Sequence, residues 1–463
     1  MTVRKKIEMT EGPLWNKILA FSLPIAATGI LQQLFNSADV AVVGRFVSKQ
    51  AMAAVGANSS VINIMINLFV GVSLGANIVI SRYTGKKDQE QVEKAVHTAL
   101  LVAVLSGCLV TLFGELTARN ILELMSVPED VMEMAVLYLR IYIGGMPVIL
   151  LYNFESAIYQ SQGDTRTPLF VLSVSGIINV ILNLFFVLVV GMTVDGVAIA
   201  TVISNAVSAT ILFLNLKRGK LGIRIQKDQF RIDRKLLGMM LRVGLPAGIQ
   251  GMIFSISNII IQAAVNSLGT DAVAGSSAAY NIEILAYYVV NSFSQACTTF
   301  VSQNYGAGKP ERCRKVLQIA LLDTTVIGGG FSFLLLAFGK QLLGIFNHDP
   351  AVIEMGYYKL FWILCFEILN GAIDNLSGAM RGYGESMKPA IVTLVGICGV
   401  RITWVYTNFQ SHHTFNVLMM AYPVSWTITL AVMSAMYFHL RSRGLGKIPD
   451  QDVQPADRLR KQK

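Results

Sequence analysis

Four long stretches of the chain contain no Asp, Glu, Lys or Arg: residues 50–81, 167–194, 243–270 and 284–308. Each is longer than the roughly 20 residues that a helix needs to cross the hydrocarbon of a bilayer. Lipid offers no hydrogen-bond partners, so backbone groups there must pair within the chain. The alternating pattern of a membrane barrel strand is absent. The sequence therefore predicts a membrane protein built from α-helices.

Composition agrees with this prediction, because 53% of the residues are hydrophobic, 14% are charged, and the mean hydropathy is +0.55. Placing spans between the charged loops predicts about twelve, six in each half of the chain. The first span follows basic residues but is too long for a cleaved signal core, so we keep it as a mature helix. The predicted spans lie near 15–44, 51–80, 95–114, 131–160, 168–190, 194–216, 238–267, 272–302, 316–338, 352–380, 389–408 and 414–438.

An internal duplication links the two halves. The segment Gly163 to Pro168 (GDTRTP) matches Gly384 to Pro389 (GESMKP), 221 residues later, and residues 81–85 match 302–306 at the same offset. Two apolar repeats are the architecture of many secondary transporters, whose substrate site lies between them. We expect an amino-terminal lobe at 1–222, a carboxy-terminal lobe at 223–445 and a polar cytoplasmic tail at 446–463.

Basic residues predict the orientation in the membrane. In the twelve-span interpretation the loops rich in Lys and Arg all fall on one side, and the loops of the other side are acidic. The positive-inside rule then places both termini in the cytoplasm of a multi-pass cell membrane protein. The net charge of +10 has the same origin, and we expect contact with anionic lipid and no binding of nucleic acid. The basic clusters are at residues 4–6, 82–94, 217–235, 309–315 and 441–447.

Charged residues inside spans are candidates for function, because charge in lipid is costly. Asp39 lies in an uncharged stretch of the first span, fifteen residues after Pro24. Removal from water favours the protonated form of a carboxyl, so Asp39 is a candidate to carry a proton, or to bind Na⁺ if other oxygens complete a shell. Asn179 and Asn183, spaced i and i+4, share one helix face, where they either bind a carboxylate or cation or hold helices together.

A second group of acids lies in the carboxy-terminal half: Glu283, Glu367 and Asp374. The last two are spaced i and i+7 on one helix face, and the group is a candidate cavity lining that attracts organic cations. Arg401 could neutralise one of these acids. Glu155, near the predicted cytoplasmic end of its span, suggests a gating or structural role.

Enzyme signatures are absent from the sequence. It contains no Walker A motif, nucleophile elbow or H-E-x-x-H motif, and no Cys/His spacing typical of a metal site. We therefore expect neither catalytic activity, nor a bound metal, nor an organic cofactor.

The chain resembles the MATE (multidrug and toxic compound extrusion) family over nearly its whole length. The resemblance rests on Asp39-Val-Ala-Val-Val-Gly-Arg45, Gly163 to Pro168, Asp195-Gly-Val-Ala-Ile-Ala-Thr201, Gln303-Asn-Tyr-Gly-Ala-Gly-Lys309 and Arg381-Gly-Tyr-Gly384. It implies two six-helix lobes around a central cavity and efflux of organic cations in exchange for H⁺ or Na⁺.

By position, the resemblance assigns ion or proton coupling to Asp39 with Asn179, Asn183 and Thr201. In the other lobe, Phe254 stands where some members carry a Glu, and the tenth-helix Asp of those members falls near Asn370, one turn from Asp374. A Na⁺ site is therefore not expected in that lobe, and Asn370 joins the candidates for the substrate cavity.

The resemblance favours a monomeric antiporter with H⁺ as the coupling ion and Na⁺ as the nearest alternative. A flippase for lipid-linked saccharides, from the wider superfamily, would need a basic cavity, whereas the acids here favour cations. A membrane scaffold or a channel is a third possibility. The segment 401–416, with His412 and His413, does not follow the family pattern.

Overall fold

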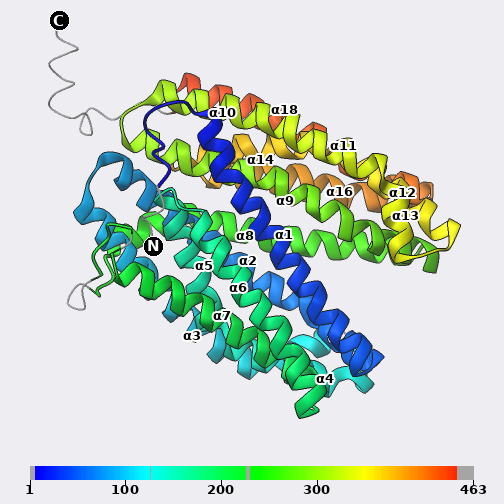
Figure 1. The fold of residues 1–463 in the computed structure, drawn as a ribbon. Helices are drawn as coiled ribbons and strands as arrows, with labels where there is room; N and C mark the ends of the chain where they lie inside the picture. Colours follow the sequence, from blue (N-terminus) through cyan, green and yellow to red (C-terminus); the bar gives the residue numbers. More distant parts are fainter. Residues whose placement is uncertain (1–5, 126, 220, 226–229, 446–463) are drawn as a thin grey trace, which may run out of the picture. The chain divides into compact units, whose positions relative to one another are not determined.

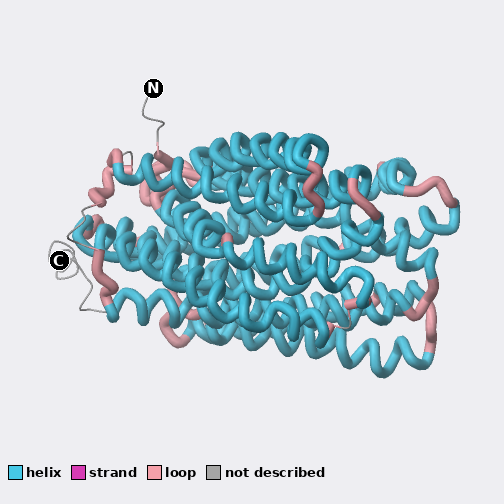
Figure 2. The backbone as a smooth tube through the Cα atoms, turned by 90° about the horizontal axis from the view of Figure 1, so that it is seen from below, coloured by secondary structure: helices cyan, strands magenta, loops and turns pink. Residues whose placement is uncertain are grey.

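The computed structural model describes residues 6–125, 127–219, 221–225 and 230–445. The predicted tail at 446–463, and the basic residues Arg4 and Lys5, lie outside the described residues. Within the described part the chain is helical, with short connecting loops and no strand (Figure 2).

The first half of the chain forms long helices (Figure 1). They are α1 (Trp15–Phe46), α2 (Lys49–Lys86), α3 (Gln89–Leu124), α4 (Glu129–Gly144), α5 (Met146–Ser161), α6 (Arg166–Leu184), the π-helix η1 (Phe185–Val190) and α7 (Val194–Lys217).

The second half begins with α8 (Arg234–Asn266), α9 (Thr270–Gly306), α10 (Pro310–Asp323), the π-helix η3 (Thr324–Gly328), α11 (Gly329–Ala337) and α12 (Gly339–Phe346). It continues with α13 (Pro350–Leu364), α14 (Glu367–Gly382), α15 (Met387–Thr393), η4 (Leu394–Gly399), α16 (Val400–Trp404), η5 (Val405–Phe409), α17 (Phe415–Met419) and α18 (Ala421–Ser442).

All twelve predicted spans fall on helices, and the all-α prediction is confirmed. In the described chain, nine continuous helical segments are long and apolar enough to cross a membrane, and α4 with α5 forms a tenth span bent by 50°. The other two predicted spans are α9 and the pair α13 and α14. Helix α9 has 37 residues but is rich in Ser, Thr, Asn and Tyr, and α13 and α14 are short, with 15 and 16 residues.

The chain forms two compact units that are not continuous in sequence. Unit 1 comprises Met1–Lys6, Pro24–Ile80 and Gln89–Ser255, and unit 2 comprises Ile7–Leu23, Ser81–Asp88 and Ile256–Lys463. Helices α1, α2 and α8 therefore contribute to both units. The lobes expected from the repeat, 1–222 and 223–445, stay a prediction about the linear sequence.

Small residues let the helices of unit 1 approach closely. A Cβ atom on Gly107 of α3 would overlap the backbone of Pro147 in α5, and one on Gly71 of α2 would overlap the backbone of Gly248 in α8. Such contacts replace the hydrophobic driving force that is missing between helices in lipid. An apolar cluster that includes Val43, residues 135–139 and residues 194–198 fills the space among α1, α4 and α7.

In unit 2, the amino-terminal segment is attached to α9 and α10. The Asn304 side chain donates a hydrogen bond to the Met9 carbonyl (3.2 Å), and Trp15 Nε1 donates to Asp323 Oδ1 (2.6 Å). These bonds explain why residues 7–23 belong to unit 2 although α1 continues into unit 1.

The duplication is visible in the backbone of matching turns. After α5, Asp164 N donates to Tyr159 O (3.0 Å), and after α14, Glu385 N donates to Met380 O (2.9 Å), with both partners 221 residues further along. The residue before each donor has a left-handed backbone, with φ of 83° at Gly163 and 97° at Gly384. The two halves thus share local geometry as well as sequence.

The two repeats also contact each other inside unit 2 through matching glycines. Gly85 and Gly306 lie 221 residues apart in the sequence. A Cβ atom on Gly85 would overlap the Gln303 carbonyl, and one on Gly306 would overlap the Arg82 carbonyl. Neither backbone carbonyl can move without displacing its own helix.

We predict that Gly85→Ala lowers stability by about 1 to 3 kcal/mol, because overpacking against backbone costs that much. Gly56→Ala, in the same helix α2 but with no atom within 4 Å of the added Cβ, is the matched control and should be neutral or stabilising. The measurement is the apparent melting temperature of the purified protein in detergent, followed by size-exclusion chromatography. Equal melting temperatures for the two variants would contradict the close packing at Gly85.

Candidate functional site

Four polar side chains from three helices of unit 1 come together, and they are the four predicted for ion coupling. Asn183 Nδ2 of α6 donates to Asp39 Oδ1 of α1 at 2.5 Å. Thr201 Oγ1 of α7 lies 3.1 Å from Asp39 Oδ2. Asn179 joins the group through Thr201 Oγ1 (3.3 Å) and Asn183 (3.3 Å).

The group is closed off from solvent. Asp39 is 6% exposed and Asn183 is 0% exposed. Its neighbours in the apolar cluster include Val43 of α1, Tyr138 of α4 and Val197 of α7. A polar cluster in such an environment is stabilised by its own hydrogen bonds, because water is not available to replace them.

Local sequence explains how the donors are aimed. Asn179 and Asn183 lie one helical turn apart on α6, so both amides face α1 and α7. The π-helix η1 begins at Phe185, two residues after Asn183. A π-turn of this kind rotates the residues that follow it and is frequent at functional sites.

Neutral donors alone surround the carboxyl. Among the residues that the structure describes, no Lys, Arg or His forms an ion pair with Asp39, and its hydrogen bonds come from Asn183 and Thr201. The Thr201 hydroxyl also lies 3.0 Å from the Val197 carbonyl. When Asp39 is ionised, Thr201 can donate to it, and when Asp39 is protonated, Thr201 can accept from it while donating to Val197.

The acids predicted to line a cavity lie in unit 2, where basic side chains accompany them. Glu283 of α9 forms an ion pair with Lys359 of α13 (3.1 Å), and both side chains are largely buried. Lys359 Nζ also donates to the Ser276 carbonyl (3.2 Å) and lies over the Tyr280 ring. Lys359 was not among the residues predicted from the sequence, although it is the one Lys within the predicted span 352–380.

Glu367, Asn370 and Asp374 share α14. Asn370 Nδ2 donates to Glu367 Oε1 at 3.0 Å, and Asn291 Nδ2 of α9 lies 3.5 Å from Asp374 Oδ2. Arg381, one helical stretch further, is close enough to attract Asp374. The three residues are therefore partnered within unit 2 and do not form a cluster of free carboxylates.

Arg401 is buried between two aromatic rings. Its guanidinium lies 4.1 Å from the centroid of Tyr422 and 5.5 Å from that of Trp426, and it donates to Ser425 Oγ (3.2 Å). Its charge also acts on Glu283 and Glu367. Together with Lys359 and Arg381 it gives three basic groups for three acids, so the described site is charge-balanced and not acidic.

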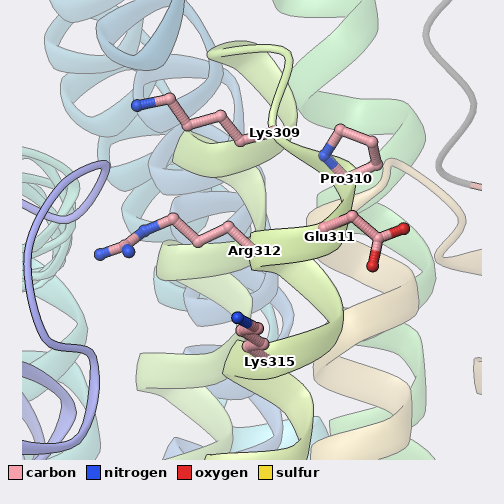
Figure 3. Close-up of a pocket in the computed structure, with 5 residues that line it drawn as sticks. All are labelled: Lys309, Pro310, Glu311, Arg312 and Lys315. Carbon is pink, nitrogen blue, oxygen red and sulfur yellow. The ribbon is translucent and has the colours of Figure 1, made fainter.

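A surface pocket at the start of α10 is lined by Lys309, Pro310, Glu311, Arg312 and Lys315 (Figure 3). Lys309, Arg312 and Lys315 extend to one side in this view, and Glu311 points away from them. Two of these basic groups are already used: Lys309 donates to the Thr10 carbonyl (3.0 Å) and Arg312 to those of Met9 and Glu11 (3.2 and 2.8 Å). They hold the amino-terminal segment and need no ligand.

No metal site emerges from the described residues, in which no three His, Cys, Asp or Glu side chains are grouped so that they could hold an ion. The site at Asp39 offers one carboxylate, two amides and a hydroxyl. That set suits a proton or a monovalent cation better than a transition metal.

Comparison with known proteins fits this arrangement. The chain is 27% identical over 436 residues to the probable multidrug resistance protein YoeA of Bacillus subtilis, covering 92% of this chain and 93% of the relative. It is 26% identical to the probable multidrug resistance protein NorM of Thermotoga maritima, covering 83% and 84%. A crystal structure described as a MATE P26A mutant has the same fold, with a TM-score of 0.88, 22% identity and coverage of 96% and 99%.

The family model MatE matches the chain twice, at residues 24–185 and 246–407. The two matches coincide with the two repeats of the sequence, and the second ends inside η5, before the atypical loop with His412 and His413. Because the matched residues make up well over half of the sequence, the chain belongs to the MatE family.

Proposed function

We propose that this protein is a secondary active efflux transporter, which exports organic cations in exchange for H⁺ by alternating access, with Asp39 as the proton-binding group. It acts as a monomer in the cell membrane with both termini in the cytoplasm. The relatives YoeA and NorM, both described as probable multidrug resistance proteins, support efflux of varied substrates.

The observation that carries the proposal is the buried carboxyl of Asp39, whose hydrogen bonds suit both of its protonation states. The Thr201 hydroxyl can reverse its role between the Asp39 carboxyl and the Val197 carbonyl. Gain of a proton therefore removes a charge from the interior of unit 1 and leaves its hydrogen bonds satisfied. A ligand drives a transport cycle only through different affinities for the two states, and the proton supplies that difference.

Na⁺ is the alternative coupling ion. The Oδ1 atom of Asn183 is buried without a hydrogen-bond partner, and with the Asp39 carboxylate it could contribute to an oxygen shell. In the structure, however, the Asn183 amide group donates to Asp39, and such a donor opposes a cation at the same oxygen. This geometry favours the proton.

For the substrate we propose the acids of α14, Glu367 and Asp374, with Asn370 between them. Their neighbours on α9 include Tyr287, which is 37% exposed, and a phenol ring suits the flat apolar body of an organic cation. Glu283 is the less suitable candidate, because Lys359 already neutralises it.

We predict that Asp39→Asn abolishes proton-driven transport and leaves the protein folded, because the amide keeps the shape but cannot carry a proton. The measurement is transport of a fluorescent organic cation in proteoliposomes under an imposed pH gradient and, separately, under a Na⁺ gradient. Wild-type rates in Asp39→Asn would overturn the role of Asp39. Transport by the wild type under the Na⁺ gradient alone would replace H⁺ by Na⁺.

Thr201→Val should lower the proton-driven rate by about tenfold, because loss of a hydrogen bond to a charged group costs about 1.5 to 3 kcal/mol, and 1.4 kcal/mol corresponds to tenfold. Thr201→Ser is the matched control, which keeps the hydroxyl and should stay close to wild type. The same proteoliposome assay measures both variants. A Val variant as active as the Ser variant would show that the hydroxyl plays no part.

The buried ion pair of unit 2 gives a prediction about stability. Lys359→Met leaves the Glu283 carboxylate without its partner and should cost about 3 to 5 kcal/mol. Adding Glu283→Gln removes the uncompensated charge, so the double variant should regain most of the lost melting temperature. Additive losses in this double-mutant cycle would mean that the two side chains do not interact.

A further inference from the structure

Unit 1 contains a second buried acid, which the site at Asp39 does not use. Glu155 lies on α5 and is 0% exposed, and both of its carboxyl oxygens are buried without a hydrogen-bond partner. Tyr152 and Ser156 place hydroxyl groups nearby on the same helix, but neither forms a hydrogen bond to the carboxyl. No Lys, Arg or His of the described chain forms an ion pair with it.

This environment is costly for an ionised carboxyl. An unpaired charge away from water loses its solvation, and the protein returns no donor and no opposite charge. Packing alone does not explain the residue either, because an apolar side chain of similar volume would fill the space without an unsatisfied polar group. A carboxyl retained under these conditions points to a ligand that it binds, and the smallest such ligand is a proton.

The position of Glu155 can be read from the helix registers. Tyr159, one turn after Glu155, donates from its hydroxyl to the Leu212 carbonyl of α7 (3.1 Å). Thr201, the partner of Asp39, lies eleven residues before Leu212 on α7, a rise of roughly 16 Å at 1.5 Å per residue. Glu155 is thus separated from the Asp39 site along the helix axes, toward the end of α5 that leads into the turn at Gly163.

Buried hydroxyl groups lie between the two acids. Ser208 of α7 donates to Ser175 of α6 at 2.6 Å, and both are buried. Ser208 lies between Thr201 and Leu212 in the sequence of α7, so this pair sits at an intermediate level. The interior of unit 1 is therefore polar at three successive levels between α5, α6 and α7.

We propose that Glu155 is a second proton-binding group, located in the half of unit 1 toward the cytoplasm, which holds a proton while that half is closed and releases it when water enters. The direction of this step rests on the proposed function and on the predicted topology, in which α5 ends in the cytoplasm. The proton leaves a carboxyl oxygen of Glu155 for cytoplasmic water, and the carboxylate remains. Asp39 then receives protons from the outer side, and Glu155 controls their release.

Other titratable groups are either turned elsewhere or lie at other levels. Helices α3, α4, α6 and α7 pack against α5, and Asn77 of α2 donates to the Ala157 carbonyl (3.0 Å). The residues 50–80 of α2 contain no charge. His97 of α3 contacts the Glu93 carbonyl (2.7 Å) and the Phe230 ring. The remaining groups near this end are Glu90, Glu93 and Lys94 of α3, Arg166 of α6 and Lys217 of α7, with Tyr138 and Tyr142 of α4 near Asp39 and the phenols Tyr152 and Tyr159 on α5 itself.

Infrared difference spectroscopy tests proton binding directly. The full-length protein in liposomes is cycled between low and high pH, and the carbonyl stretch of protonated carboxyl groups is recorded in the Asp39→Asn background, which removes the contribution of Asp39. We expect a band that disappears when Glu155→Gln is added and shifts when Glu155→Asp is added. Tyr152→Phe, one turn away on α5, is the matched control and should leave the band in place.

Transport supplies the second readout. Glu155→Gln alone should lower proton-driven transport by about tenfold or more while fluorescence-detected binding of the organic cation persists, and Glu155→Asp should retain part of the activity with an altered pH profile. An infrared spectrum that neither substitution changes, or a Gln variant with the wild-type rate and pH profile, would overturn the proposal. If the Gln variant does not fold, the Asp variant alone must still shift the band.

The two proposals fail in different ways. Wild-type transport by Asp39→Asn refutes the role of Asp39, and the Glu155 band is scored in the same protein without reference to transport. A missing Glu155 band together with inactive Asp39→Asn refutes only the second proton-binding group.

Discussion

Every membrane-spanning segment of this protein must satisfy its backbone hydrogen bonds within its own helix. That constraint makes the fold all-α and leaves polar side chains within the spans as exceptions that need partners of their own. Asp39, Glu155 and Glu283 are three such exceptions, and their partners differ. Glu283 has a lysine at 3.1 Å, Asp39 has neutral donors, and Glu155 has no hydrogen-bond partner among the described residues.

This difference separates the two units by chemistry. In unit 2, three acids are accompanied by Lys359, Arg381 and Arg401, so loss or gain of a proton there would disturb ion pairs. In unit 1, neither Asp39 nor Glu155 is held by a basic residue of the described chain, and either can change its charge without breaking an ion pair. The charge balance of unit 2 also means that acidic residues alone do not define a preference for cations, and substrate selectivity there depends on the aromatic rings as well.

The duplication preserved the backbone and not the site. Matching turns, such as those at Gly163 and Gly384, keep the same hydrogen bonds and left-handed φ. The positions equivalent to Asn179, Asn183 and Thr201 are Val400, Trp404 and Tyr422, and the position equivalent to Asp39 is Ile261. Turn geometry is required twice because each repeat must reverse direction in the same way, whereas one ion-coupling site suffices for exchange.

Local sequence was enough to predict the helices, the repeat and the residues of the Asp39 site, because hydropathy, helical spacing and an acid within lipid are properties of neighbouring residues. Asn179 and Asn183 could be placed on one face from their spacing alone. The sequence could not place Lys359 against Glu283, the guanidinium of Arg401 between Tyr422 and Trp426, or residues 7–23 in a different unit from the rest of α1. It also could not distinguish Glu155, which lacks partners, from Asp39, which has them. These pairings join residues up to 308 positions apart, and only the packing of the helices decides which of the many distant polar groups come within hydrogen-bonding distance.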